Sequence, residues 1–66
     1  MNNKIRVARA EVRMTQQQLA EAVDVSRQTI NAIESGKFVP STVLALKIAR
    51  TFGKSVEDIF FLEDED

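Results

Sequence analysis

The sequence of 66 residues contains no cysteine and no histidine. These absences exclude disulfide bonds, thiolate and imidazole metal ligands, and every catalytic arrangement that pairs serine or cysteine with histidine. An enzyme of this composition would depend on carboxylates, lysine, serine or threonine alone. We therefore expect a protein without enzymatic activity, metal site or cofactor.

Long apolar runs are absent as well. The longest runs, such as 43–46 and 59–62, have four residues, whereas a membrane-spanning helix needs about 20 and a signal peptide about 7–15. We therefore expect a soluble, cytoplasmic protein with no membrane partner. The short length predicts one domain, residues 1–66, and no separate small-molecule effector domain.

Charge is distributed unevenly along the chain. Residues 1–54 contain all nine lysines and arginines with four acidic residues, whereas residues 55–66 contain six acidic residues and no basic one. The body of the domain therefore carries +5 and its end −6. This asymmetry suggests an anionic partner approached from one side, the alternative being a mixed surface followed by a solvated tail. We interpret the acidic residues 63–66 as a solvated tail and not as a cation site, because no turn glycine accompanies them.

The periodicity of the apolar residues predicts an all-α fold. Thr15 and Ser55 are each followed three residues later by a side chain that completes a capping box, Gln18 and Asp58. No stretch of strand length alternates between apolar and polar residues. We expect five helices, at about residues 4–12, 16–23, 27–35, 42–52 and 56–60.

The second and third of these helices, with a three-residue turn, have the dimensions of a helix-turn-helix at residues 16–35. The start of the third helix is polar, with Arg27, Gln28, Thr29 and Asn31. Arginine, glutamine and asparagine match the guanine and adenine edges that the major groove of DNA exposes. The alternative is an ordinary solvated helix face.

Three segments carry a more specific pattern: Thr15-Gln16-x-x-Leu19-Ala20, Val25-Ser26-Arg27-x-x-Ile30-x-x-Ile33-Glu34-x-Gly36-Lys37, and Pro40-Ser41. Together they resemble the Xre/Cro-type helix-turn-helix of phage repressors and of small bacterial and archaeal regulators. The resemblance covers roughly residues 4–60. It implies a five-helix, phage-repressor-like DNA-binding domain that acts as a dimer on a near-palindromic operator.

The resemblance also implies which residues contact bases. The base-contacting positions of the family fall on Arg27 and Gln28, at the start of the recognition helix. Asn31 is a weaker match. Ala32 lies where some members have a base-contacting glutamine, and its methyl group could offer only apolar contact, for instance with a thymine methyl.

Other positions are implied to contact the DNA backbone or to support the fold. The implied phosphate contacts are Thr15, Gln16, Ser35 and Lys37. Arg9 and Glu34 match the positions of a buried ion pair that links the first helix to the third. We interpret this pair as structural and not as catalytic.

We also expect a homodimer joined through its C-terminal part. Phe60, Phe61 and Leu62 continue past the short fifth helix, which cannot turn all of them inward. Leu44 and Ile48 complete the expected contact surface, because they lie off the stripe expected to be buried in the fourth helix, which is Ala45, Leu46, Ala49 and Phe52. The alternative is that all of them fold onto a single core.

These observations predict a sequence-specific, non-enzymatic DNA-binding regulator. Within the family it resembles, a repressor is the expected type, acting by occupying an operator and excluding polymerase. The alternative is a protein-interaction module with the same fold, such as an antitoxin that binds a toxin. A small hydrolase that uses carboxylates has no supporting group of residues.

Overall fold

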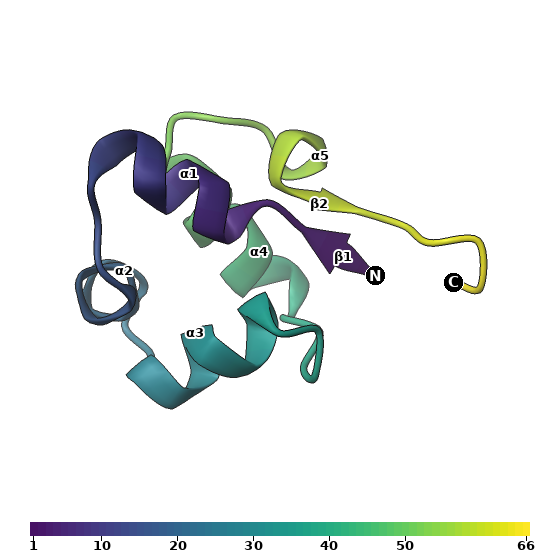
Figure 1. Ribbon diagram of the computed structural model, residues 1–66, viewed down its shortest axis with the longest axis horizontal. Coiled ribbons are helices and arrows are strands. Elements are labelled where there is room, and N and C mark those ends of the chain that lie inside the picture. The colour runs from purple at the N-terminus through teal and green to yellow at the C-terminus, as the bar shows by residue number, and fades with distance from the viewer.

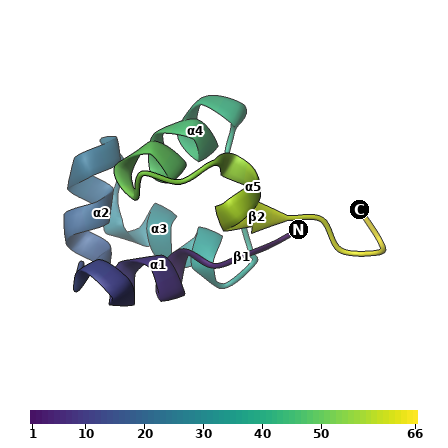
Figure 2. The same cartoon turned by 90° about the horizontal axis from the view of Figure 1, so that it is seen from above.

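The computed structural model describes residues 1–66 as five α-helices and a small sheet (Figure 1). Figure 2 shows α1 and α4 on opposite sides of the molecule, with α2 at one end and α5 at the other. No helix has both the length and the apolar character that crossing a membrane requires. In chain order the elements are β1 (Asn2–Asn3), α1 (Ile5–Val12), α2 (Gln16–Val23), α3 (Arg27–Glu34), α4 (Thr42–Thr51), α5 (Val56–Ile59) and β2 (Phe60–Phe61).

Polar side chains set the starts of four helices. The Thr15 hydroxyl accepts a hydrogen bond from the Gln18 N–H (3.0 Å), and Gln18 Oε1 accepts one from the Thr15 N–H (2.8 Å). This reciprocal pair satisfies two donors that the first helical turn leaves free. α5 begins with the same arrangement, and serine hydroxyls cap α3 and α4. The predicted capping boxes are therefore confirmed.

The two short strands pair antiparallel, with Asn2 opposite Phe61 and Asn3 opposite Phe60. The Lys4 N–H extends the contact by donating to the Ile59 carbonyl at 2.8 Å. The predicted five-helix class is confirmed, but this sheet was not predicted, because two-residue strands show no alternation in sequence. The sheet joins the N-terminal segment to the end of α5, and the tail continues outward from it (Figure 1).

Apolar residues from all five helices form one core. The expected stripe of α4 is wrong at one position, because Leu46 is 54% exposed whereas Ile48 is fully buried. Successive helical residues are rotated by about 100°, so the face that contains Ala45 and Ala49 includes Ile48 and turns Leu46 outward. The largest fully buried side chains are Ile5, Leu19, Ile30, Ile33, Ile48 and Ile59.

The expected dimer surface is corrected at two positions. Ile48 and Phe60 belong to the core of the chain itself, so neither side chain is available to a second copy. Leu44 is half-buried against that core. Phe61 remains exposed, because neighbouring residues of an extended segment point to opposite faces and Phe60 takes the inner one. Leu62 is exposed because it lies beyond the end of β2.

Candidate nucleic-acid interface

α2, α3 and the turn between them form the helix-turn-helix expected at residues 16–35. α2 ends at Val23, and the next residue, Asp24, has the left-handed φ of 62° that terminates the helix. The Val25 N–H then bonds to the Ala20 carbonyl at 3.0 Å. Ala20 is fully buried, and its small side chain lets the two helices pack closely. Ser26 caps α3, so the helix starts at Arg27, and the polar side chains of Arg27, Gln28 and Asn31 are exposed on its first turns.

Three polar side chains stand exposed on the first turns of α3. Arg27, Gln28 and Asn31 line one shallow hollow of about 240 Å³. No hydrogen bond or ion pair within the chain occupies their polar groups. Thr29 differs from them, because its hydroxyl is 3.0 Å from the Ser26 hydroxyl. The three free side chains can therefore donate and accept hydrogen bonds toward a ligand.

A second hollow, of about 450 Å³, lies between the starts of α2 and α3. Arg27 lines both hollows, so the two are neighbours. Thr15 and Gln16, expected at phosphates, therefore lie beside Arg27, which is expected at bases. The residues around the second hollow are Arg9, Thr15, Gln16, Gln17 and Arg27.

The remaining expected contacts lie elsewhere on α3 or just after it. Ser35 and Lys37 are exposed beyond its C-terminal end. The Ser35 hydroxyl donates to the Ala32 carbonyl at 3.1 Å. Ala32 itself is half-buried. The structure thus brings Thr15 and Gln16 together with Arg27. It places Ser35 and Lys37 after the C-terminal end of α3.

Arg9 and Glu34 form the ion pair expected from the sequence. The Arg9 Nε donates to Glu34 Oε2 at 2.7 Å, and Nη2 donates to Oε1 at 3.0 Å. Arg9 also donates through Nη1 to the Met14 carbonyl at 2.9 Å. The Glu34 side chain is 1% exposed and that of Arg9 15%. The pair links α1 to α3 on the inner side of the helix-turn-helix.

Two further side chains reach Glu34, and the sequence analysis missed both. Gln16 Nε2 donates to Oε1 at 3.3 Å, and the Arg6 Nε lies 3.7 Å from the same oxygen. Arg6 precedes Arg9 by three residues on α1, a spacing that places both on one face and could have indicated its role. An amide nitrogen has two hydrogens, so Gln16 keeps one hydrogen free while the other bonds to Glu34.

These neighbours determine the ionisation of the pair. Burial alone would raise the pKa of Glu34, but hydrogen bonds from Arg9 and Gln16 and the charges of Arg9 and Arg6 outweigh it and hold that pKa below its ordinary value. The hydrogen bond to Glu34 raises the pKa of Arg9. Both groups are therefore charged at neutral pH and compensate each other inside the fold.

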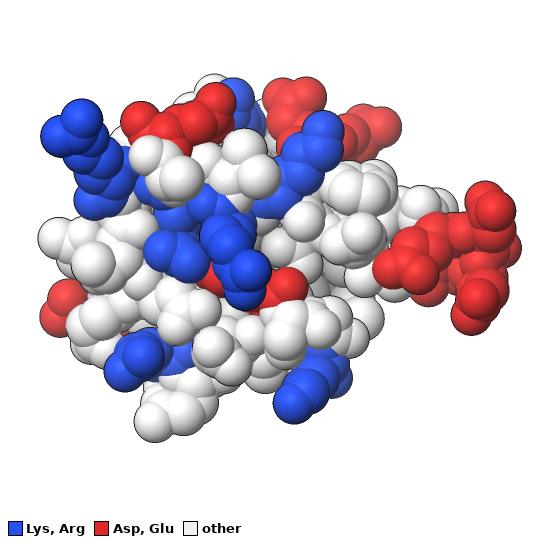
Figure 3. Space-filling model, in the orientation of Figure 1, with Lys and Arg blue, Asp and Glu red and all other residues white.

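The acidic tail lies away from the helix-turn-helix. Figure 3 shows lysine and arginine side chains spread over the face formed by α1, α2 and α3, and a dense group of acidic side chains on the tail at the right end. This separation matters because carboxylates beside the helix-turn-helix would repel a polyanion such as DNA. The geometry is therefore compatible with nucleic acid on the helix-turn-helix side.

Comparisons with known proteins agree with this geometry. The helix-turn-helix family model matches residues 5–59. The HTH-type transcriptional regulator YgzD of Bacillus subtilis is 48% identical over 66 residues, and the alignment covers 100% of both chains. An HTH-type transcriptional regulator of Methanocaldococcus jannaschii is 53% identical with the same coverage.

A solved structure of a gene regulator has a similar fold. The clp gene regulator ClgR from Corynebacterium glutamicum matches with a TM-score of 0.77 and 33% sequence identity. The match covers 82% of this chain and 57% of the ClgR chain. The family model spans most of this sequence, and the two relatives align with this chain over its full length. The chain therefore belongs to the Xre-type helix-turn-helix family of transcriptional regulators.

Proposed function

We propose that this regulator is a cytoplasmic repressor that binds a near-palindromic operator as a homodimer, with α3 in the major groove. The supporting observation is that the side chains of Arg27, Gln28 and Asn31 are exposed, line one hollow and form no hydrogen bond or ion pair within the chain. A guanidinium can donate two hydrogen bonds to guanine O6 and N7, and a side-chain amide fits adenine N6 and N7. Repression then requires only that the bound domain exclude polymerase.

The proposed phosphate contacts come from two segments. Thr15 and Gln16 lie at the start of α2, where a helix presents free backbone N–H groups to an anion. Ser35 and Lys37 follow the end of α3. Phosphate contacts from these two segments would fix α3 along the groove, so that Arg27 and its neighbours meet the base edges in one register. The half-buried Ala32 would add at most a methyl contact with thymine.

Selection of bound DNA from a random pool tests the proposal. A homodimer predicts an inverted repeat whose half-site centres are about 10 bp, or about 34 Å, apart. Enrichment of a single unrepeated site would contradict the dimer, and no enrichment at all would contradict sequence-specific binding. Transcription from a promoter that carries the selected site, with and without the protein, then distinguishes a repressor from an activator.

Truncating the proposed base-contacting side chains is expected to weaken binding selectively. Arg27→Ala and Gln28→Ala should each cost about 1–3 kcal/mol at the selected site and relax the preference at one base pair. Both side chains are exposed and unbonded within the chain, so neither change should alter the melting temperature noticeably. Affinity for the selected site and for random DNA is measured with each variant by fluorescence anisotropy.

Lys37→Ala is the matched control for these variants. A lysine at a phosphate should weaken binding to all sequences by similar factors and lower the slope of log affinity against log salt by about 1. Equal losses on selected and random DNA for Arg27→Ala and Gln28→Ala would refute their assignment to bases. A selective loss for Lys37→Ala would refute its assignment to a phosphate.

A further inference from the structure

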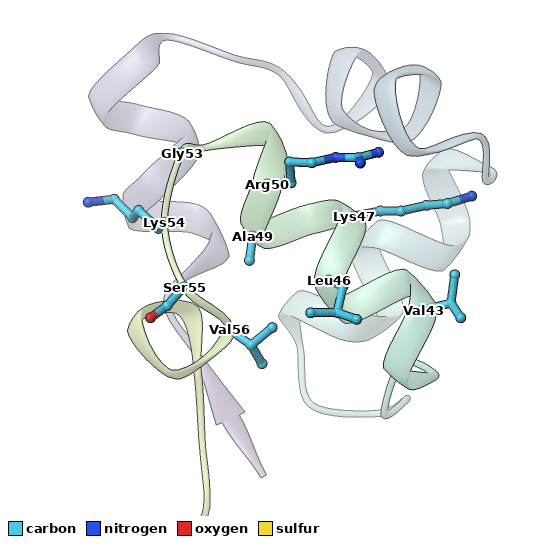
Figure 4. Close-up of a pocket in the computed structure, with 9 residues that line it drawn as sticks. All are labelled: Val43, Leu46, Lys47, Ala49, Arg50, Gly53, Lys54, Ser55 and Val56. Atoms are coloured by element: carbon cyan, nitrogen blue, oxygen red, sulfur yellow. The ribbon is translucent and has the colours of Figure 1, made fainter.

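An apolar groove lies between α4 and α5, outside the helix-turn-helix. It has a volume of about 860 Å³, and its apolar floor consists of Val43, Leu46, Ala49 and Val56 (Figure 4). Val43 is 63% exposed and Leu46 54%. Exposed apolar surface of this kind on a small domain indicates a contact with another segment or molecule.

The rim of this groove is cationic. Lys47 and Arg50 extend from α4 on one side, and Lys54 extends from the α4–α5 loop on the other (Figure 4). None of these three cations forms an ion pair within the chain, where every salt bridge involves Met1, Arg6 or Arg9. A segment that combines an apolar side chain with several carboxylates would match both the floor and the rim.

The chain itself contains a segment of this chemistry. Leu62 is 76% exposed and is followed by four consecutive acidic residues, 63–66. Figures 1 and 2 show that this tail continues beyond β2 and extends away from α4. Glu63 and Asp66 pair with the Met1 amino group of their own chain, whereas Leu62, Asp64 and Glu65 are exposed and are available to another molecule.

The end of the tail reaches Met1, which adjoins the face that contains the groove. The Met1 amino nitrogen is 2.7 Å from an Asp66 carboxylate oxygen. Met1 also lines a smaller hollow of about 220 Å³ that includes Val39, Leu46 and Val56. Leu46 and Val56 line the groove as well, so the two hollows form a continuous face.

We propose that a second copy of this chain covers the α4–α5 groove, with its Leu62 on the apolar floor and its acidic residues 63–66 beside Lys47, Arg50 and Lys54. In a two-fold dimer each copy offers one groove and one tail, so the contact forms twice. The inference rests on the proposed homodimer and names the surface that forms it. It replaces Ile48 and Phe60, which are buried, with Leu46, Val56 and the tail.

Paired charge reversals in the full chain test this contact. The groove variant is Lys47→Glu with Lys54→Glu, and the tail variant is Glu63→Lys with Asp64→Lys. The groove variant places a groove of net charge −1 opposite a tail of −4, and the tail variant places a tail of net charge 0 opposite a groove of +3. Each variant alone therefore loses the attraction between tail and groove, and we expect the dimer dissociation constant to rise about tenfold at low ionic strength. In an equal mixture one contact of a mixed dimer joins an unaltered tail to an unaltered groove, and association should return part of the way to the parental level. Sedimentation equilibrium measures each case.

Glu11→Lys with Glu21→Lys is the matched control for the tail variant. It changes the net charge by the same amount at exposed positions of α1 and α2, and it should leave dimerisation within about twofold of the parent. Leu46→Asp tests the apolar floor separately, because the side chain is exposed and the variant should still fold. We expect it to weaken the dimer by more than the groove variant does.

The inference would be overturned if the parent protein were monomeric, or if the mixture of groove and tail variants associated no better than either variant alone. It would also be overturned if the control variant weakened the dimer as much as the tail variant does, or if the Leu46→Asp protein dimerised as strongly as the parent. If the tail bound the groove of its own chain, mixing the two variants would not restore association, and the inference would be wrong. DNA selection reports on the proposed function independently, because a monomer can still select a half-site and a dimer can form without binding DNA.

Discussion

Replacing Glu34 with alanine is expected to destabilise the fold by about 3–5 kcal/mol, a large share of the about 5–15 kcal/mol typical of a whole domain. The carboxylate is buried and receives two hydrogen bonds from Arg9 and one from Gln16. Its removal leaves the Arg9 guanidinium, only 15% exposed, without an opposite charge. Urea unfolding and thermal melting measure the loss.

Glu21→Ala is the control, because it removes an exposed carboxylate from α2 and should change stability by less than about 0.5 kcal/mol. The DNA affinity of Glu34→Ala should fall only as far as the folded fraction falls. At a temperature where the variant is folded, it should bind nearly as the parent does. A variant as stable as the parent that had lost DNA binding would contradict the structural role of the pair.

The Glu34 carboxylate is also expected to make the free energy of unfolding depend on pH in the acidic range. The pKa of Glu34 is lower in the fold than its ordinary value, so its ionised form stabilises the folded state at neutral pH. That contribution is complete above the unfolded pKa of about 4.3 and is lost as the pH falls through the lower folded pKa. We therefore expect the free energy of unfolding to decrease below about pH 4.3, as measured by urea unfolding across that range.

A variant comparison isolates this contribution from those of other carboxylates. Hydrogen bonds from the Ser55 backbone and side chain lower the pKa of Asp58, and the pKa of Asp66 is also lowered, chiefly by a backbone hydrogen bond at Glu63. Both groups therefore add to the acid dependence. Glu34→Gln should reduce the slope of stability against pH, and Asp58→Asn should reduce it less, because Asp58 is exposed. A Glu34→Gln slope equal to that of the parent would contradict the pKa assignment.

The helices were predictable because the signals that start and end them are local. Thr15 and Gln18 form hydrogen bonds with each other's backbone within one turn, and Gly36 adopts the positive φ of 79° that ends α3 and its following turn. The start of the candidate site followed from the same logic. Because Ser26 caps α3, the polar residues that directly follow it had to lie on the first turns of that helix.

Features that depend on distant parts of the chain were not predictable in this way. α4 has apolar residues on most of its circumference, including Val43, Leu44, Leu46 and Ile48, so periodicity could not decide which face enters the core. Packing against α2 and α5 decides it. The bond from Gln16 to Glu34 joins two helices, and the pairing of Asn2 with Phe61 joins the two ends of the chain.

Ile48→Ala is expected to destabilise the fold by about 2–5 kcal/mol, because truncating a fully buried isoleucine loses its apolar contacts and leaves a cavity. Ile48 has no exposed surface and belongs to the core that all five helices share. A domain of this size buries a small core, so the loss should lower the melting temperature strongly. Urea unfolding at a fixed protein concentration gives the magnitude.

Leu46→Ala is the matched control, since it removes a similar apolar side chain two residues away on the same helix. Leu46 is 54% exposed, so its truncation should cost the isolated fold less than about 1 kcal/mol. If a second copy covers the α4–α5 groove, Leu46→Ala lowers stability more at high protein concentration, where the parent is dimeric, than at low concentration. Ile48→Ala should instead lose the same free energy at both concentrations. Equal losses for the two variants at low concentration would mean that α4 packs with a different face from the one in the structure.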